Sequence, residues 1–397
     1  MKIAVVSIYP QKASKHVKAS GVASYAKNLL KNIPLQPEDE LFVICEKLDG
    51  VSETYQEDGI TVVRAFDRNA NFLRQIYAAA REINPDVVHI QQEVPLYGGI
   101  HTAYMLQHLA RMLKRYNVVI TFHHVVNLRI VDKKFVRDNG SKLPVRAIKT
   151  AFKVVYKPLV KQASRMIVHE QYFKQLLVDQ YGANANKVDV IPHGVEDFTP
   201  VDMQTARQKL DIPAGKHVVL FMGYLAGYKG FDLLIEGFAE YVKRDPDAYL
   251  VIGAGKHPKF ENDQTYLQDY AAKQAKAEKL IGAGNYRWIG FIDEKDIADY
   301  YSAADVSLYP YTISMSSSGP MSFAMGYEKP FLASDVFKDV LPPNVLFDRT
   351  PEALAGKLED FFKNIKSYGQ LSKTMKQSRL WGTVGQLTMD TYKETIK

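Results

Sequence analysis

The sequence predicts two α/β domains, each built on a doubly wound parallel sheet with helices on both faces. Three observations support this fold class. At 397 residues the chain is too long for one compact core of ordinary size. Short apolar runs rich in β-branched residues alternate with helical patterns along almost the whole chain. A segment rich in proline, glycine and aspartate interrupts this alternation near Pro192, where we place the domain boundary.

The first half of the chain contains the apolar runs expected of strands that are buried on both faces. Such strands form continuous apolar stretches instead of alternating apolar and polar residues. Polar turns and amphipathic segments separate the runs, as connecting helices would. The runs are residues 2–9 (KIAVVSIY), 41–46 (LFVICE), 61–66 (TVVRAF), 86–91 (DVVHIQ), 117–124 (NVVITFHH) and 166–170 (MIVHE).

The second half of the chain repeats this pattern after the interruption. A helical pattern with Trp381 and Tyr392 as apolar anchors follows the last run, over residues 371–397. Two α/β halves joined in this way are expected to bind ligands at the carboxyl ends of their strands. The runs are residues 218–225 (VVLFMGYL), 248–255 (AYLVIGAG), 286–292 (YRWIGFI), 306–311 (VSLYPY) and 330–335 (PFLASD).

The composition is that of a globular protein with an anionic partner. Hydrophobic residues make up 46% and charged residues 24%, and the net charge is +7. The partner indicated by this charge is a nucleotide, a lipid surface or nucleic acid. Cys45 is the only cysteine and lies in an apolar run, so we expect it in the core, without a disulfide. The first apolar run is too short for a signal peptide, and we expect a cytoplasmic protein.

Two strand-to-helix turns contain glycine and suit an anion. Gly21 precedes a helical pattern, and loop amides at a helix start bind phosphates; a plain connecting loop explains this turn equally well. The second turn, residues 223–230, contains three glycines and Lys229. Its ammonium is placed to stabilise the charge of a diphosphate, and we expect it to be exposed.

Five further stretches complete the pattern: DVVHIQQEVPLYGG, TFHHVV, VIPHGVEDF, YLVIGAGKHPKF and DIADYYSAADVSLYPY. Together with the two glycine turns, they make the chain resemble the retaining family 4 glycosyltransferases over nearly its whole length. HIQxE…GG, TxHxV and the SSG turn resemble a mannosyltransferase-like branch. The resemblance implies the GT-B fold, with Rossmann-like domains at residues 1–192 and 193–375 facing a cleft, and a helix, 376–397, that crosses back to the first domain. It implies transfer of a mannose- or glucose-type hexose from a GDP- or UDP-sugar to a glycan or lipid-linked saccharide, without cofactor or metal.

The resemblance also assigns site residues. It implies that His123 lies near the reacting sugar and that Lys229 clamps the diphosphate, which makes these two the catalytic candidates. His124 is the alternative to His123, and His124 and Glu93 are implied to contact the acceptor or sugar. The implied donor-binding residues are Gly21, Gly223, Tyr224, Lys229, Gly253, Phe291, Ser317, Ser318, Gly319 and Met321.

The chain departs from the family pattern at four positions. Tyr224 stands where many members have arginine, and Glu328 stands where glycine is usual before Lys-Pro. Met315 and Phe323 occupy the positions of the Glu-x7-Glu pair, so charge-assisted hydrogen bonds to the donor are lost. A second hypothesis is therefore a catalytically weakened GT-B protein that binds glycan or supports a partner enzyme. A DNA-modifying transferase of this fold is a third.

Residues 133–165 form a strongly basic segment in which Asp138 is the single acid. Apolar residues recur there at helical spacing, from Val145 to Val155, with basic residues at other positions. A helix of this kind is able to lie on an anionic membrane, which makes the protein a candidate peripheral protein of the inner membrane face. A helix packed on the core with a solvated basic face explains the pattern equally well. We expect no nucleic acid partner, because no recognised module accompanies the segment.

Overall fold

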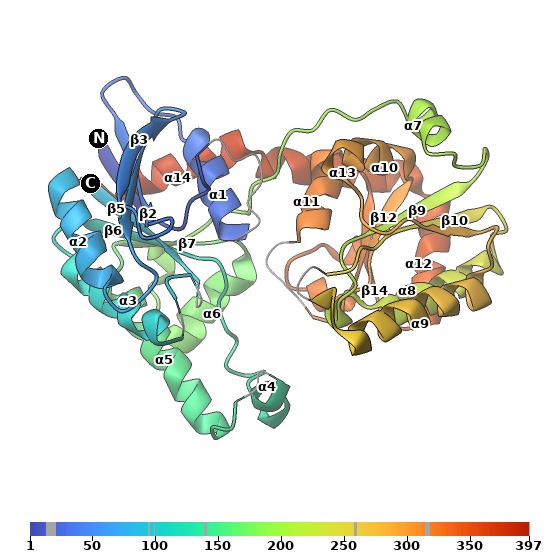
Figure 1. The fold of residues 1–397 in the computed structure, drawn as a ribbon, viewed down its shortest axis with the longest axis horizontal. Coiled ribbons are helices and arrows are strands. Elements are labelled where there is room, and N and C mark those ends of the chain that lie inside the picture. Colours follow the sequence, from blue (N-terminus) through green and yellow to red (C-terminus); the bar gives the residue numbers. More distant parts are fainter. Residues whose placement is uncertain are drawn as a thin grey trace. The chain divides into compact units, whose positions relative to one another are not determined.

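A computed structural model describes residues 1–12, 21–93, 96–98, 100–138, 141–257, 260–313 and 318–396. The chain divides into two compact units, which Figure 1 shows in colours that follow the sequence. Unit 1 comprises Met1–Gly194 and Trp381–Lys397, and unit 2 comprises Val195–Leu380. The divisions expected from the sequence, after residues 192 and 375, lie shortly before these positions.

Unit 1 is built on a sheet in which the described strands follow the order β3-β4-β2-β1-β5-β6-β7-β8. All neighbours pair in parallel except β3 and β4, which are antiparallel at the edge of the sheet. The predicted parallel sheet is therefore confirmed, with an added edge strand whose sequence, ETYQE, is too polar to resemble a buried run. The strands are β1 (Lys2–Val6), β2 (Glu40–Glu46), β3 (Glu53–Glu57), β4 (Ile60–Phe66), β5 (Val87–Gln92), β6 (Asn117–Phe122), β7 (Arg165–Val168) and β8 (Val188–Val190).

Helices cover both faces of the unit 1 sheet. One apolar cluster joins it to α2, α3, α5 and α6, and a second joins the other face to α1 and α14. Cys45 is buried in this second cluster, as predicted. None of the helices in the described residues has the length and hydropathy of a membrane span. The helices are α1 (Gly21–Lys31), α2 (Phe72–Ile83), α3 (Ile100–Met112), α4 (Lys133–Asp138), α5 (Val145–Gln162), α6 (Gln171–Tyr181) and α14 (Trp381–Ile396).

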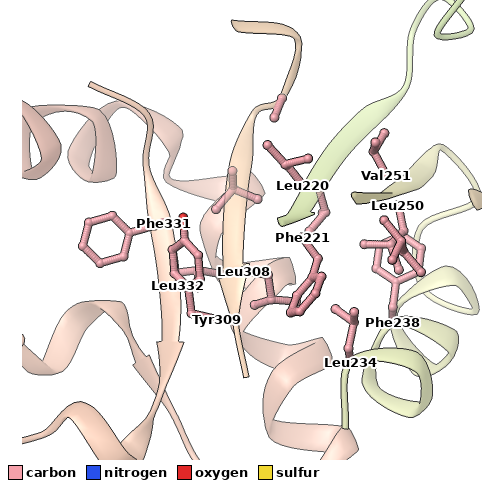
Figure 2. Packing of buried hydrophobic residues seen from close by; sticks show 14 of the residues in the cluster. Leu220, Phe221, Leu234, Phe238, Leu250, Val251, Leu308, Tyr309, Phe331 and Leu332 are labelled. Atoms are coloured by element: carbon pink, nitrogen blue, oxygen red, sulfur yellow. The ribbon is translucent and has the colours of Figure 1, made fainter. Parts of the chain in front are cut away.

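Unit 2 is built on a second parallel sheet with the order β11-β10-β9-β12-β13-β14. Figure 2 shows residues of its core, where Leu220 and Phe221 of β9 meet side chains from neighbouring strands and α8. The strands are β9 (His217–Met222), β10 (Ala248–Gly253), β11 (Tyr286–Trp288), β12 (Val306–Tyr309), β13 (Phe331–Ser334) and β14 (Leu346–Phe347). The helices are α7 (Met203–Lys209), α8 (Phe231–Val242), α9 (Gln264–Ile281), α10 (Ile297–Ala303), α11 (Gly319–Gly326), α12 (Pro351–Lys363) and α13 (Ile365–Arg379).

Each sheet has a point at which the strand order reverses. In unit 1 the chain leaves β1 for β2 on one side, and β5 later pairs with the other side of β1. In unit 2 the same holds for β9, with β10 on one side and β12 on the other. Loops diverge at such points, so ligands bind at the carboxyl ends of the strands there.

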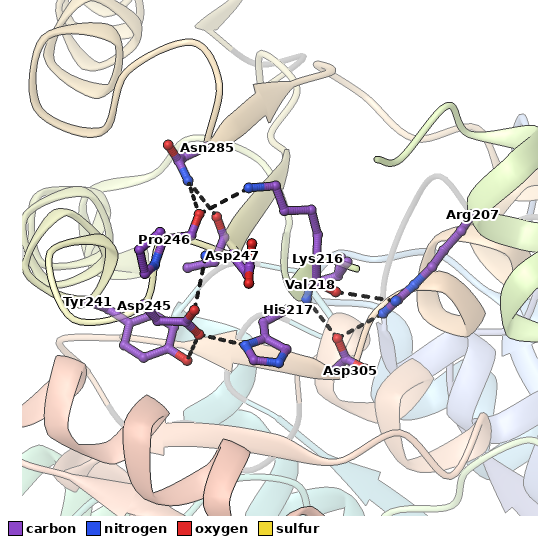
Figure 3. Close-up of polar contacts among 11 residues, drawn as sticks. Arg207, Lys216, His217, Val218, Tyr241, Asp245, Pro246, Asp247, Asn285 and Asp305 are labelled. Carbon is purple, nitrogen blue, oxygen red and sulfur yellow. Dashed lines mark hydrogen bonds and ion pairs between the residues drawn. The ribbon is translucent and has the colours of Figure 1, made fainter. Parts of the chain in front are cut away.

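Polar contacts tie together the opposite, amino ends of the unit 2 strands (Figure 3). The Asp305 carboxylate accepts a hydrogen bond from Arg207 at 2.8 Å, and the Asp245 carboxylate accepts one from the His217 ring at 2.6 Å. Asp245 and Asp247 have Asp-x-Asp spacing, but they lie in the turn before β10, away from the carboxyl ends of the strands. This network holds the amino ends of the unit 2 strands in place.

The C-terminal segment returns to unit 1, as the predicted fold requires. Helix α13 ends at Arg379, Leu380 forms a bridge with Val195, and α14 begins at Trp381, so the helical pattern from residue 371 belongs to two helices. The anchor Trp381 is 6% exposed. Gly385 lets α14 approach the end of α1, because a Cβ atom at this position would lie 1.9 Å from the Asn32 carbonyl oxygen.

We predict that Gly385→Ala lowers the stability of unit 1 by about 2 kcal/mol, because the added methyl group forces the backbones of α14 and α1 apart. The matched control is Gly382→Ala in the same helix, where a Cβ atom would meet nothing within 4 Å. This control is expected to raise stability by up to about 1 kcal/mol through helix propensity. Urea unfolding of both variants checks the prediction, and equal effects would contradict it.

Candidate functional site

We call the point at which the strand order of a sheet reverses its switch point. The turn that follows β9 lines the switch point of unit 2. This turn contains the 3-10 helix η2 (Gly227–Lys229) and ends at Gly230, whose φ is 71°. A Cβ atom at Gly230 would lie 1.8 Å from the Pro310 carbonyl oxygen, so only glycine allows η2 to dock on the end of β12. Gly223 has φ 145°, and a Cβ atom there would lie 3.4 Å from Lys229 Nζ. The glycines therefore hold the lysine at the carboxyl end of the sheet.

Lys229 is buried, with 6% of its surface exposed, and the expectation of an exposed lysine is wrong. Its ammonium donates to the Tyr311 hydroxyl and lies 4.0 Å from the centre of the Tyr311 ring. Among the described residues it has no ion-pair partner, and burial lowers its pKa to about 8. Because a buried cation without an anion is unfavourable, this arrangement is suited to an anionic ligand.

The start of α11 lies next to this lysine through Tyr311. Ser318 is 6% exposed, and its Oγ lies 3.0 Å from Tyr311 Oη. Gly319, the first residue of α11, is exposed, whereas Met321 packs in the core of unit 2. A helix start supplies unpaired amides that favour an anion. Ser317 and Met315, which the sequence places in the same turn, lie outside the described residues.

An aromatic pair lies near the carboxyl ends of β9 and β10. The Tyr224 ring stacks on Phe291, with centroids 5.7 Å apart and planes at 16°, and Phe291 is 62% exposed. The His257 ring lies 5.3 Å from Tyr224. A Cβ atom at Gly253 would lie 2.4 Å from Ile292, so glycine lets the segment after β11 pack on β10. The exposed Phe291 ring and the half-buried Tyr224 ring offer a face on which a planar base can lie.

Two further departures from the family pattern have structural explanations. Phe323 packs against Phe198 and Tyr301, with ring centroids 5.6 Å and 6.0 Å away, so this position belongs to an aromatic cluster. Glu328 has φ 55°, a conformation that favours glycine. Its carboxylate accepts a hydrogen bond from Lys376 of α13 at 3.3 Å. This ion pair joins the turn after α11 to α13.

In unit 1, His123 follows β6 and is 7% exposed. Its Nε2–H donates to Gln91 Oε1 at 2.7 Å, and its Nδ1 lies 3.2 Å from His169 Nε2. The Tyr25 ring meets it edge-on at 4.8 Å. Burial and the neighbouring imidazoles hold the pKa of His123 well below its ordinary value, so the ring is neutral. A ring with so low a pKa is a weak base, but it can form hydrogen bonds.

The other predicted residues of unit 1 differ in exposure. His124 is exposed, with its ring 5.4 Å from that of Phe173. Glu93 is half-buried, and burial raises the pKa of its carboxyl. Gly21 is the exposed first residue of α1, and a Cβ atom there would meet no atom within 4 Å. None of the described residues therefore fills the space beside Gly21.

Two buried polar atoms near the unit 1 switch point have no hydrogen-bond partner among the described residues. They are Ser7 Oγ, after β1, and Gln92 Oε1, at the end of β5. Because such atoms lose hydration without compensation, they favour a hydroxyl-bearing ligand. Sequence reasoning missed these residues, because motifs do not show which buried atoms lack partners. It also missed Tyr311 and His169, because their contacts with Lys229 and His123 join segments that are far apart in the sequence.

No three His, Cys, Asp or Glu side chains gather into a group able to hold a metal ion, within the described ranges. The imidazoles near His123 contact one another and Tyr25 instead. The polar groups that the structure brings to the two switch points are thus an ammonium, hydroxyls, imidazoles and a carboxyl.

Two family models match the chain. The model described as Glycosyltransferase Family 4 matches residues 19–197, and the model described as Glycosyl transferases group 1 matches residues 202–378. These two stretches correspond closely to units 1 and 2.

Curated relatives match a shorter part of the chain. A mannosylfructose-phosphate synthase from Agrobacterium fabrum is 33% identical over 136 residues, which cover 33% of this chain and 29% of that protein. A D-inositol 3-phosphate glycosyltransferase from Streptosporangium roseum is 30% identical over 158 residues, which cover 38% of this chain and 35% of that protein. The chain thus spans about a third of the length of these relatives.

Solved structures match over the full length. A sucrose-phosphate synthase from Thermosynechococcus elongatus has a TM-score of 0.69 at 17% identity and covers 99% of this chain and 98% of its own. Anabaena HepE, solved in complex with UDP, has a TM-score of 0.69 at 16% identity and covers 99% of this chain and 100% of its own. At this identity the likeness establishes the fold.

We predict that Lys229→Met stabilises the protein at pH 7, because it removes a buried cation that lacks an anion. Burial lowers the pKa of Lys229 from the ordinary 10.5 to about 8, and this fall corresponds to a loss of roughly 3 kcal/mol at most in the free energy of unfolding. Below pH 8 the folded protein carries the full penalty, and between pH 8 and 10.5 deprotonation of folded Lys229 relieves it. Wild type should therefore approach the variant in stability across this pH range. A pH-independent difference in chemical unfolding would contradict the prediction.

Proposed function

The chain belongs to the family 4 glycosyltransferases of GT-B fold, and from this premise we propose a retaining hexosyltransferase. It moves a mannose- or glucose-type sugar from a GDP- or UDP-linked donor to a glycan or lipid-linked saccharide. The observation that carries this proposal is the buried Lys229 ammonium, which lacks an ion-pair partner among the described residues at the switch point of unit 2.

In this proposal unit 2 binds the sugar nucleotide. Lys229 and the first amides of α11 hold the diphosphate, and the Tyr224–Phe291 pair lies against the base. A fixed cation and fixed amides stabilise the charge that grows on the departing diphosphate, without reorganisation during the reaction. We propose that this stabilisation needs no metal ion. HepE structures in complex with UDP-glucose support a donor of this class.

Unit 1 contributes the contacts to sugar and acceptor. The low pKa of His123 favours a role as a neutral hydrogen-bonding group over a role as a general base. The acceptor would attack the anomeric carbon from the front face, assisted by the departing diphosphate, so the configuration at that carbon is retained. The polar atoms of Ser7 and Gln92, which lack partners among the described residues, favour an acceptor that carries hydroxyl groups, as saccharides do.

A catalytically weakened protein is the second candidate, and Phe323 is the observation that favours it. The family has a donor-gripping glutamate at this position, whereas Phe323 lies in an aromatic cluster with Phe198. A carboxylate at this position would lose its hydration among the aromatic rings, so the position favours an apolar side chain over a charged one. Such a protein would bind a nucleotide or glycan without turnover.

We propose that a membrane surface brings the acceptor to the enzyme through α5. This helix contains no acidic residue, and five of its cations share one stripe at spacings of three or four: Arg146, Lys149, Lys153, Lys157 and Lys161. None of the five has an ion-pair partner among the described residues. Lys157, Lys161 and Lys187 also line a cavity of about 400 Å³. Unpaired cations on one stripe complement anionic phosphate head groups.

A panel of nucleoside diphosphates and sugar nucleotides tests the proposed function. A ligand at a hundred times its dissociation constant should raise stability by about 2.7 kcal/mol in a thermal-shift measurement. Turnover of the best donor, in the presence of a chelator, should fall at least a hundredfold in Lys229→Met. Lys243→Met, an exposed lysine of unit 2, is the control and should leave turnover unchanged. If no nucleotide shifts the transition, the proposal is wrong; binding without turnover would favour the weakened protein.

The role of His123 is tested by substitution of each of two adjacent histidines. We predict that His123→Ala lowers kcat by about tenfold to a hundredfold and leaves nucleotide affinity almost unchanged, because in this proposal the ring contacts the sugar and not the nucleotide. His124→Ala is the matched control and should have a smaller effect. If His124→Ala reduces kcat more than His123→Ala, the assignment to His123 is incorrect.

Membrane association is tested by co-sedimentation with vesicles of phosphatidylcholine, with and without phosphatidylserine. Each cation near the surface contributes about 1 kcal/mol, so Lys149, Lys153 and Lys157 changed to Glu should abolish binding. Salt should weaken wild-type binding, because it shortens the Debye length. The control changes three lysines of unit 2 to Glu: Lys243, Lys363 and Lys373. Equal binding to neutral vesicles, or equal loss in both variants, would contradict the electrostatic account.

A further inference from the structure

Three buried polar side chains from separate segments form one chain of hydrogen bonds at the unit 2 switch point. They are Lys229 of η2, Tyr311 after β12 and Ser318 before α11, with exposed fractions of 6%, 0% and 6%. Lys229 Nζ donates to Tyr311 Oη, and Tyr311 Oη lies 3.0 Å from Ser318 Oγ. The tyrosine hydroxyl is therefore the link between the lysine and the start of the helix.

The chemistry of these groups fixes the direction of the chain. A protonated lysine has three hydrogens and no lone pair, so Lys229 can only donate to Tyr311. The tyrosine hydroxyl accepts that bond and has one hydrogen of its own, which it donates to Ser318. Burial raises the pKa of Tyr311, so the phenol keeps this hydrogen.

Ser318 receives the last bond of the chain. Its Oγ accepts from Tyr311, so its own hydroxyl hydrogen points elsewhere. The Ser318 side chain makes no capping hydrogen bond to the backbone of α11. The hydrogen is thus available to an acceptor near the first amides of that helix, where an anion is favoured.

We infer that Tyr311 is a positioning residue for the donor diphosphate, which it serves by fixing the Lys229 ammonium and aiming the Ser318 hydroxyl at a phosphate oxygen. This inference rests on the proposed function, since it assumes that the anion at this site is the diphosphate of a nucleotide. Tyr311 acts through its two neighbours and need not touch the ligand.

Tyr309 provides a matched control for Tyr311. Tyr309 is fully buried in the same segment, its ring lies 5.9 Å from the Tyr311 ring, and its hydroxyl also contacts α11, donating to the Pro320 carbonyl oxygen at 2.8 Å. It does not contact Lys229 or Ser318 in any described hydrogen bond. Tyr309→Phe therefore removes a buried hydroxyl next to α11 and leaves the chain of three intact.

The experiment is titration of the whole 397-residue chain with UDP or GDP, whichever binds wild type more tightly, and with the matching nucleoside. Tyr311→Phe keeps the ring beneath Lys229 and removes only the hydroxyl. It should weaken diphosphate binding about tenfold and leave nucleoside binding unchanged, because the lost bonds involve a charged group. Tyr309→Phe should bind both ligands as wild type does. Ser318→Ala should weaken diphosphate binding to a similar degree. The double variant should bind the diphosphate only slightly more weakly than either single variant.

The outcomes separate this inference from the proposed function. If wild type binds neither diphosphate, the proposed function fails and the inference fails with it. If wild type binds and Tyr311→Phe binds equally well, Tyr311 has no positioning role and the proposed function stands. An equal loss of nucleoside affinity would show a structural role only. Should Tyr311→Phe not fold, an unchanged diphosphate affinity of Ser318→Ala would overturn the inference by itself.

Discussion

The functional account depends on one constraint, the close contact of Gly230 with the end of β12. A side chain at Gly230 would collide with the Pro310 carbonyl oxygen, so the glycine brings η2 and Lys229 against the sheet. This contact buries the ammonium beside Tyr311 and lowers its pKa. The protein thereby holds a cation that has no anionic partner among the described residues, at the position where the strand order of unit 2 reverses. Binding of a diphosphate would supply that partner.

The two units present different chemistry at equivalent places in their sheets. In unit 2 the carboxyl ends of β9 and β12 hold an ammonium and a hydroxyl pair, with a stacked aromatic pair nearby. In unit 1 the carboxyl ends of β1, β5 and β6 hold the neutral His123 imidazole, and the Ser7 hydroxyl and Gln92 amide oxygen that lack hydrogen-bond partners among the described residues. The first set suits a nucleotide, and the second suits a polyhydroxylated molecule. A transferase that joins these two substrate classes needs both sets, which is why we assign donor and acceptor to different units.

The fold was largely predictable because parallel strands buried on both faces leave continuous apolar runs, and every run quoted from the sequence contains a strand. Edge strand β3 escaped prediction because its residues are polar. Within the site, the glycine turn identified Lys229, but not its burial, which depends on the distant Pro310. Tyr311 was missed for the same reason, because its role arises from contacts with two other segments.

The central claim, that Lys229 is the cation for a diphosphate, is tested most directly by proton uptake on binding. At pH 8 about half of the free protein carries a protonated Lys229, since its pKa is about 8. A bound diphosphate should raise this pKa, so calorimetry in buffers of different ionisation enthalpy should show uptake of about half a proton. Lys229→Met should show weaker binding without uptake. Equal uptake by both proteins, or none by wild type, would contradict the account.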